Sequence, residues 1–250
     1  MNSQLRYFLH WLFPKWLYAF STKVRIPRSR EDFRKMLLAK YVLQGGGTAI
    51  DVGAHVGYHT RYLAEIVGDR GMVWAFEPNP YVFSLLNKYA SKSATINARQ
   101  KAVSNRSSCS VDFYLTPYSL EQDSTLELNR KGGTHRKFSV KTIALDDLLL
   151  EGLKDLKLIK IDVEGHEKKV LEGAQKVIEK FRPCIVFEYC SKEQENPLIC
   201  MSKLNYVCYD LDALRLLDPT MKTDLIDVLA FPKEKEEEMK PFISCLKLFV

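Results

Sequence analysis

The sequence has no apolar run long enough to cross a membrane, and this absence excludes a polytopic membrane protein. No segment approaches the ~20 uninterrupted apolar residues that a spanning helix needs. The sequence also contains no internal repeats. Hydrophobic residues make up 46% and charged residues 27% of the 250 residues, which excludes the compositional bias of fibrous or disordered chains. Such a chain is long enough for one large α/β domain or at most two small ones.

Paired cysteine motifs are missing as well. None of the six cysteines forms a C-x-x-C motif, so the sequence has neither the spacing of a zinc site nor that of a secreted disulfide framework. We therefore expect reduced thiols in a cytoplasmic protein.

The body of the chain lacks an excess of positive charge. The net charge is +6, but nine of the 37 Lys and Arg residues and only two of the 31 Asp and Glu residues fall in the first 40 positions. The rest of the chain therefore holds 28 basic and 29 acidic residues. Because nucleic-acid-binding surfaces are strongly cationic, we predict no nucleic-acid partner.

The first 40 residues differ from the rest of the chain. We predict an N-terminal aromatic and basic helical segment over residues 1–40 and one main domain over residues 41–250. The run from Tyr7 to Phe20 holds seven aromatic residues in fourteen positions. One interpretation is a helix whose aromatic side chains pack either on the core of the domain or in a dimer contact. The sequence does not distinguish these two arrangements, so the oligomeric state stays open. The other is an interfacial helix that makes peripheral contact with an anionic membrane through residues 7–35.

From residue 41 onward, short apolar segments alternate with amphipathic ones. This alternation predicts an α/β domain with a mostly parallel sheet and helices on both faces. The predicted strands are Thr48–Val52, Met72–Phe76, Thr95–Ala98, Leu156–Ile161, Pro183–Phe187, Tyr206–Tyr209 and Val228–Phe231. The predicted helices are Tyr58–Val67, Pro80–Tyr89, Glu167–Lys180 and Asn196–Leu204.

The middle of the chain is less regular. Ser110–Leu115 and Phe138–Ile143 alternate like edge strands, and the 22 residues between them, 116–137, have no clear period. Loops of that length in a compact domain are typically lids or binding loops. We therefore predict a substrate lid at residues 116–137.

The most informative segment is AIDVGAHVGYHT, at residues 49–60. An apolar strand delivers Asp51 to its end, and Gly53 and Gly57 allow a sharp turn into a helix whose free N–H groups favour a carboxylate or phosphate. The next strand is followed by Glu77, which can accept hydrogen bonds from both hydroxyls of a ribose. In an open parallel sheet both features lie at the carboxyl edge, where ligands bind.

The glycine spacing distinguishes between two cofactors. A dinucleotide site uses G-x-G-x-x-G, but His55 stands where the second glycine would be. An acidic residue two positions before the first glycine instead suits a ligand with a cationic amino group. S-adenosylmethionine has such an amino group, a carboxylate and a ribose, so we predict it as the cofactor.

Six blocks of sequence then follow one another: AIDVGAHVGYHT, WAFEPNP, QKAVSN, TIALDDLL, IKIDVEGHEKKVLEGA and IVFEY. In this order, over about residues 48–190, they resemble the FkbM family of S-adenosylmethionine-dependent methyltransferases. The resemblance implies a class I methyltransferase with a Rossmann-like, mostly parallel seven-stranded sheet that contains one antiparallel strand. It also implies O-methylation, often of hydroxyls on sugars or polyketides.

The same resemblance assigns the cofactor contacts. The methionine part would be held by Asp51, Gly53 and Gly57, the ribose by Glu77, and the adenine by Ala102 and Val103. His55 belongs to this cofactor-binding group, but the family usually has Asn at that position. One polar contact to the cofactor is therefore expected to differ.

Candidate catalytic residues follow two later strands. Asp162, Glu164 and His166 come after Leu156–Ile161, and Glu188 ends the next strand. Each could remove a hydroxyl proton while the oxygen attacks the methyl carbon. Alternatively, Glu164 only stabilises a helix N-terminus and His166 is a surface or capping residue. Asp162 with Glu164 could hold Mg²⁺, but a full ligand set is not visible and no metal site is predicted.

We therefore predict an S-adenosylmethionine-dependent O-methyltransferase acting on a hydroxyl of a sugar, glycan or polyketide-like small molecule. A nicotinamide-dependent oxidoreductase is one alternative, although the chain lacks G-x-G-x-x-G. A nucleic-acid methyltransferase is another, but the chain has IDVEGH where amino-directed members have [DN]-P-P-[YFW]. The last alternative is a non-catalytic cofactor-binding protein at the membrane surface.

Overall fold

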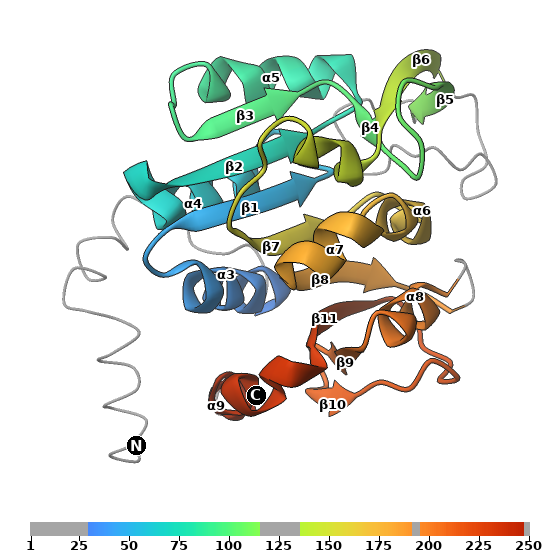
Figure 1. The fold of residues 1–250 in the computed structure, drawn as a ribbon. Helices are drawn as coiled ribbons and strands as arrows, with labels where there is room; N and C mark the ends of the chain where they lie inside the picture. The colour runs from blue at the N-terminus through green and yellow to red at the C-terminus, as the bar shows by residue number, and fades with distance from the viewer. Residues whose placement is uncertain (1–29, 116–135, 192–195, 248–250) are drawn as a thin grey trace.

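A computed structural model describes residues 30–115, 136–191 and 196–247 of the protein (Figure 1). At its centre lies an eight-stranded sheet with the strand order β10-β9-β11-β8-β7-β1-β2-β3. The strands are β1 (Gly47–Val52), β2 (Gly71–Phe76), β3 (Ile96–Arg99), β7 (Leu156–Ile161), β8 (Cys184–Tyr189), β9 (Tyr206–Asp210), β10 (Arg215–Leu216) and β11 (Ile226–Pro232).

Most of this sheet is parallel, as the alternation of strands and helices predicted. Strands β3, β2, β1, β7 and β8 run in one direction, and β11 is antiparallel to both of its neighbours, β8 and β9. The two-residue strand β10 pairs antiparallel with β9 and adds an eighth strand to the seven that were expected. All six residues of β1 are buried, which is typical of a strand covered on both faces.

The strand register aligns four strand ends at one edge of the sheet. Val52 at the end of β1 pairs with Phe76 of β2 and with Ile161 of β7, and Ile161 pairs with Phe187 of β8. The residues that follow this row are Gly53, Glu77, Asp162 and Glu188. Residues that are up to 135 positions apart in the chain are thereby brought to a single edge.

Helices cover both faces of the sheet (Figure 1). They are α3 (Arg30–Leu43), α4 (Tyr58–Val67), α5 (Pro80–Ala90), α6 (Glu167–Glu172), α7 (Gln175–Phe181), α8 (Pro197–Lys203) and α9 (Glu236–Leu246). Helices α3, α4 and α9 contribute to one apolar core, which includes Leu38 and Phe242. Helices α6, α7 and α8 contribute to the core on the other face, with Val170 and Met201.

A second, three-stranded sheet lies beside the carboxyl edge of the first. Its order is β4-β6-β5, with β4 at Ala102–Val103, β5 at Ser110–Leu115 and β6 at Arg136–Ile143. The two alternating segments in the middle of the chain are therefore strands, as predicted, and they pair antiparallel with each other. The predicted lid falls almost wholly on residues 116–135, which lie outside the described residues.

The single helix predicted over Glu167–Lys180 was wrong, because the chain forms two helices there. Gly173, between α6 and α7, packs so closely on another loop that a Cβ atom would lie 2.2 Å from the Ser104 carbonyl oxygen. The Gly173 carbonyl accepts a hydrogen bond from the Asp146 N–H (2.9 Å). This long-range contact interrupts the helix at a position where the amphipathic pattern continues.

The boundary predicted between residues 40 and 41 falls inside α3. Leu37, Leu38 and Leu43 of this helix are buried in the same core as α4, so residues 30–40 pack as part of the main domain. The aromatic run, and most of the segment predicted to contact a membrane, lie outside the described residues. Among the helices that are described, none combines the length and the apolar character needed to span a membrane.

Candidate active site

The carboxyl ends of β1, β2, β7 and β8 surround a cavity of about 380 Å³. The residues of the predicted site that line it are Gly53, His55, Glu77, Ala102, Val103, Asp162, Glu164 and Glu188. Those that do not line it are Asp51, Gly57 and His166. The cavity therefore combines most of the residues assigned to the cofactor with three of the four assigned to catalysis.

The turn between β1 and α4 is wedged between two other strand ends. The N–H groups of Gly53 and Ala54 both donate to the Phe76 carbonyl at the end of β2, at 3.0 and 2.9 Å. Gly53 has φ +73°, and a Cβ atom there would lie 1.8 Å from the Asp162 carbonyl oxygen after β7. Gly57 has φ +84° and packs against Leu86, so it shapes the turn without reaching the cavity. Only glycine fits the position of Gly53 without displacing a strand end.

Glu77 has a carboxylate that is held in place by the backbone. Its Oε1 accepts from the Asn79 N–H and its Oε2 from the His55 N–H, both at 2.8 Å. The side chain is buried, and burial outweighs these hydrogen bonds and raises the pKa of Glu77 to about 7. A carboxylate oxygen can accept two hydrogen bonds, so each oxygen keeps one site for a donor from the cavity.

Asp51 is not among the residues that line the cavity, and the cofactor contact predicted for it stays a prediction. Its side chain is fully buried beneath the turn, where Oδ2 accepts from the Thr60 hydroxyl at 2.6 Å. Its Oδ1 lies 3.4 Å from the Lys160 Nζ. Asp51 and Lys160 are partners in the β1–β7 register, so their side chains project side by side from the same face of the sheet.

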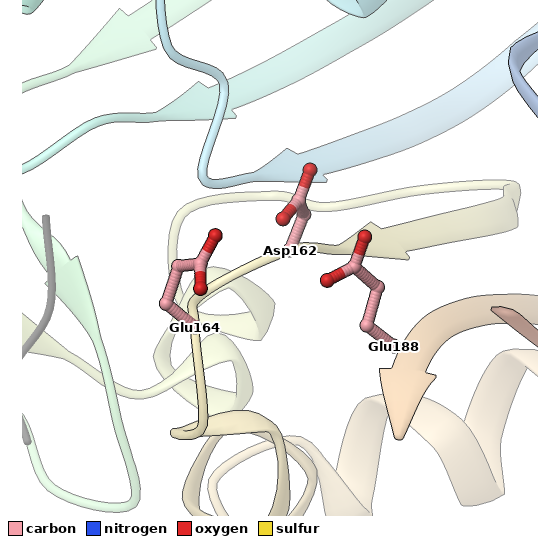
Figure 2. A group of neighbouring side chains, drawn as sticks. All are labelled: Asp162, Glu164 and Glu188. Atoms are coloured by element: carbon pink, nitrogen blue, oxygen red, sulfur yellow. The ribbon is translucent and has the colours of Figure 1, made fainter. Parts of the chain in front are cut away.

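Three carboxylates converge on the other side of the cavity. Asp162 comes from the end of β7, Glu164 from the loop after it and Glu188 from β8, as Figure 2 shows. One oxygen of each lies within 4.8 Å of the others, close enough to share a cation. No metal site was predicted, and that prediction stays untested.

The charges around these carboxylates separate their pKa values. Burial disfavours ionised Asp162, but the Lys160 and Lys35 ammonium groups outweigh it and lower the pKa of Asp162. Burial, together with repulsion from Asp162, raises the pKa of Glu188 to about 8. Asp162 therefore stays ionised near neutral pH, whereas Glu188 is the group that exchanges a proton there.

His166 does not line the cavity, and the catalytic role predicted for it stays a prediction. It is buried, and one ring nitrogen, Nε2, lies 2.9 Å from the Ser104 hydroxyl. It stands at the N-cap position of α6, with no side-chain capping hydrogen bond.

Sequence reasoning missed a group of charged residues on the cavity wall. Lys160 lines the cavity from β7, and its charge within the apolar strand LKLIKI was an available signal. Helix α3 contributes Asp32 and Lys35, which lie outside every motif block. The Nε2 of His59 on α4 lies 3.2 Å from Asp32 Oδ1 at the same wall of the cavity.

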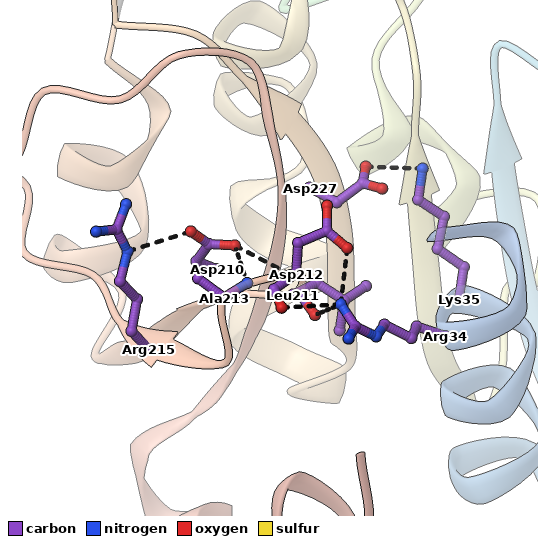
Figure 3. Close-up of polar contacts among 8 residues, drawn as sticks. All are labelled: Arg34, Lys35, Asp210, Leu211, Asp212, Ala213, Arg215 and Asp227. Carbon is purple, nitrogen blue, oxygen red and sulfur yellow. Dashed lines mark hydrogen bonds and ion pairs between the residues drawn. The ribbon is translucent and has the colours of Figure 1, made fainter. Parts of the chain in front are cut away.

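Two cationic side chains, the buried Arg34 and the partly buried Lys35, fasten α3 over the C-terminal half of the sheet (Figure 3). The Arg34 guanidinium donates to the carbonyls of Leu211 and Asp212, both at 2.9 Å, and to Asp212 Oδ1 at 2.8 Å. The Lys35 Nζ lies 2.7 Å from Asp227 Oδ1 on β11. These contacts fix the helix that supplies one wall of the cavity.

Replacing Arg34 with methionine should lower the free energy of unfolding by about 2–3 kcal/mol, because it leaves two carbonyls and a carboxylate without their donor. Arg215→Met is the matched control, since its pair with Asp210 involves a 58% exposed arginine side chain and should change stability by less than about 1 kcal/mol. Urea denaturation of both variants measures the difference. Equal effects would show that the Arg34 contacts do not fasten α3.

The fold is a Rossmann-like α/β domain with a cavity at the carboxyl edge of its parallel sheet, the edge at which such domains generally bind ligands. A family model for the "Methyltransferase FkbM domain" matches residues 51–218. The chain therefore belongs to the FkbM methyltransferase family, as its sequence blocks indicated, and it has the class I methyltransferase fold.

Individual relatives carry the same enzyme class in their names. The chain is 28% identical over 166 residues to "Hexuronic acid methyltransferase AglP" of Haloferax volcanii, a match that covers 66% of this chain and 64% of the relative. It is 34% identical over 68 residues to "Probable cobalt-precorrin-6B C(15)-methyltransferase (decarboxylating)" of Sulfurisphaera tokodaii, covering 27% and 35%. The crystal structure of methyltransferase FkbM from Methylobacillus flagellatus matches with 14% identity and a TM-score of 0.47, covering 87% of this chain and 59% of that one.

Proposed function

We propose that the protein transfers the methyl group of S-adenosylmethionine to a hydroxyl of a sugar or a similar polyhydroxylated small molecule. The observation that carries this proposal is the row of strand ends, which places Gly53 and Glu77 on one side of a single cavity and Asp162 and Glu188 on the other. One side suits an adenosyl cofactor, and the other offers carboxylates to a hydroxyl. The name of the hexuronic acid methyltransferase supports a sugar-type acceptor.

The described residues fit the proposed cofactor. Glu77 keeps one acceptor site on each oxygen, which matches the two hydroxyls of a ribose. Ala102 and Val103 give the cavity an apolar wall suited to an adenine ring. Gly53 allows the turn to approach the Asp162 carbonyl closely, which brings the ends of β1 and β7 together at the cavity. When bound, the cofactor supplies an electrophilic methyl group on a sulfonium.

The acceptor side of the cavity provides a place for the hydroxyl proton. The hydroxyl oxygen forms a bond to the methyl carbon as the carbon–sulfur bond breaks, and its proton passes to a carboxylate. Glu188 suits that role because its raised pKa, about 8, lies near neutral pH, where a general base is most effective. Asp162 stays ionised and can accept a hydrogen bond from a neighbouring hydroxyl of the same acceptor.

Methyl transfer from labelled S-adenosylmethionine to hexuronic acids, neutral hexoses, glycans and polyketide alcohols tests this function. Attack by a hydroxyl gives a methyl ether, which resists alkali. A labelled product that alkali releases as methanol would be an ester and would show that the acceptor is a carboxylate. Tight binding of a nicotinamide cofactor in place of S-adenosylmethionine would instead favour the oxidoreductase alternative.

Affinity for S-adenosylmethionine should fall about tenfold for each pH unit below about 7. Ribose hydroxyls donate to the ionised form of Glu77, whose pKa is about 7 before they bind, so protonation of Glu77 competes with binding. Glu77→Gln should weaken binding at pH 8 at least tenfold, about 1.4 kcal/mol. It should also remove the pH dependence.

Titration calorimetry between pH 5.5 and 8.5 measures both effects. Glu65→Gln is the control, because Glu65 is an exposed residue of α4 that does not line the cavity. Its affinity should follow the native pH curve. A pH-independent affinity in the native protein would remove Glu77 from the ribose site.

A further inference from the structure

We propose that Lys160 is a positioning residue that joins the cofactor turn to the acceptor-side carboxylates, holding Gly53 and Asp162 in one arrangement. This inference rests on the proposed function and adds to it a residue outside the predicted site. Lys160 lies on β7, two residues before Asp162, and its side chain is buried at the cavity wall.

The contacts of Lys160 come from three parts of the site. Its Nζ donates to the Gly53 carbonyl at 3.2 Å and lies 3.1 Å from Asp162 Oδ2 and 3.4 Å from Asp51 Oδ1. The ammonium group thus donates one hydrogen bond to the Gly53 carbonyl and lies within ion-pairing distance of two carboxylates. The arrangement explains why Asp51 is buried beneath the turn: it provides part of the negative charge that this cation requires.

The contact with Gly53 extends to the ribose side of the cavity. Gly53 precedes Ala54 and His55, and the His55 N–H is one of the two donors that hold the Glu77 carboxylate. A change in the position of the Gly53 carbonyl therefore alters the placement of Glu77. Lys160 acts on Glu77 at a distance as well, because its positive charge favours the ionised carboxylate.

The contact with Asp162 extends to the acceptor side. Ion pairing with Lys160 keeps the Asp162 carboxylate charged, and that charge is the neighbour that most strongly opposes ionisation of Glu188. Two carboxylates at the same wall are thus given different protonation states. A single buried cation organises both sides of the cavity, through Gly53 on one and Asp162 on the other.

Lys160→Met should weaken S-adenosylmethionine binding at pH 7 at least tenfold. It should also move the pH midpoint of binding upward by about half a unit, a threefold effect, because Glu77 loses a favourable charge. Lys160→Arg keeps the charge and should retain the native midpoint. Calorimetry over pH 5.5–8.5 and the pH dependence of kcat/KM are the measurements. A purely structural role would weaken binding without moving the midpoint.

The same strand offers a matched control. Lys157 donates to the Gly46 carbonyl at 2.9 Å and lies 3.6 Å from Asp155, so it repeats the glycine and aspartate contacts at the opposite end of β7. Lys157→Met should leave the affinity and its pH midpoint unchanged. Because Lys160→Met leaves Asp51 buried without its cation, the Asp51→Asn, Lys160→Met double variant provides a second test in a neutral background.

The outcomes separate this inference from the proposed function. If the native protein does not bind S-adenosylmethionine, the proposed function fails. If it binds, and folded Lys160→Met or the double variant keeps both affinity and midpoint, Lys160 is not a positioning residue. A weaker affinity with a raised midpoint in the methionine variants, and a native midpoint in Lys160→Arg, supports the inference.

Discussion

Gly53→Ala should weaken S-adenosylmethionine binding by at least 100-fold and lower the free energy of unfolding by about 3 kcal/mol. Two physical effects add at this position. The φ of +73° is in the left-handed region, which an alanine side chain disfavours, and the new Cβ would lie 1.8 Å from the Asp162 carbonyl oxygen. The end of β1 or of β7 must move. Either movement displaces the turn and the His55 N–H that holds Glu77.

Gly152→Ala separates the two contributions. Gly152 also has a left-handed φ, +84°, but a Cβ atom there would have no neighbour within 4 Å. The Gly152→Ala variant should therefore lose only about 1–2 kcal/mol in its free energy of unfolding and keep the native affinity for the cofactor. Calorimetry and urea denaturation of both variants measure the effects. Native affinity in Gly53→Ala would mean that the cofactor does not bind over this turn.

Glu188→Gln should lower kcat by about 10²–10⁴-fold while leaving the affinity for S-adenosylmethionine within about threefold of native. An amide of the same shape cannot remove the hydroxyl proton. The pH dependence follows from the raised pKa of Glu188, about 8. Below that pH the ionised fraction falls about tenfold per unit, so native kcat should rise with pH and level off above about 8. The variant should lose this dependence.

Single-turnover rates across pH 6–9.5 provide the measurement, because they separate methyl transfer from product release. Glu179→Gln is the control, since Glu179 is exposed on α7 away from the active-site cavity and should retain native kinetics. A native rate in Glu188→Gln would move the base elsewhere. The pair of His59 and Asp32 at the α3 wall is then the next candidate, because a carboxylate orients its imidazole.

Much of the fold could be predicted because its elements follow strong local patterns. The strand Leu156–Ile161 and the helix Tyr58–Val67 begin and end where their hydrophobic patterns predicted. The glycine turn and the acidic residues at strand ends were also recognisable, because a parallel sheet collects its carboxyl ends at one edge. The resemblance of six short blocks then indicated the family before any contact was known.

Other features depended on contacts that no local pattern encodes. The interruption at Gly173 arises from a loop about 70 residues earlier in the chain, so the helical pattern could not reveal it. His166 looked like a candidate base, but Ser104 holds it in a buried position. In both cases a distant segment determined the environment of the residue.

The order of the residues determined the chemistry available at the strand ends: glycine follows β1, carboxylates follow β2 and β7, and Glu188 lies near the end of β8. Strand register and packing determined the protonation states and the orientations of those side chains. The β1–β7 register sets the buried Asp51 beside Lys160, a neighbour that the sequence pattern did not reveal. The physical reason is that pKa values and ligand contacts depend on distances across strands, and such distances exist only once the sheet has formed.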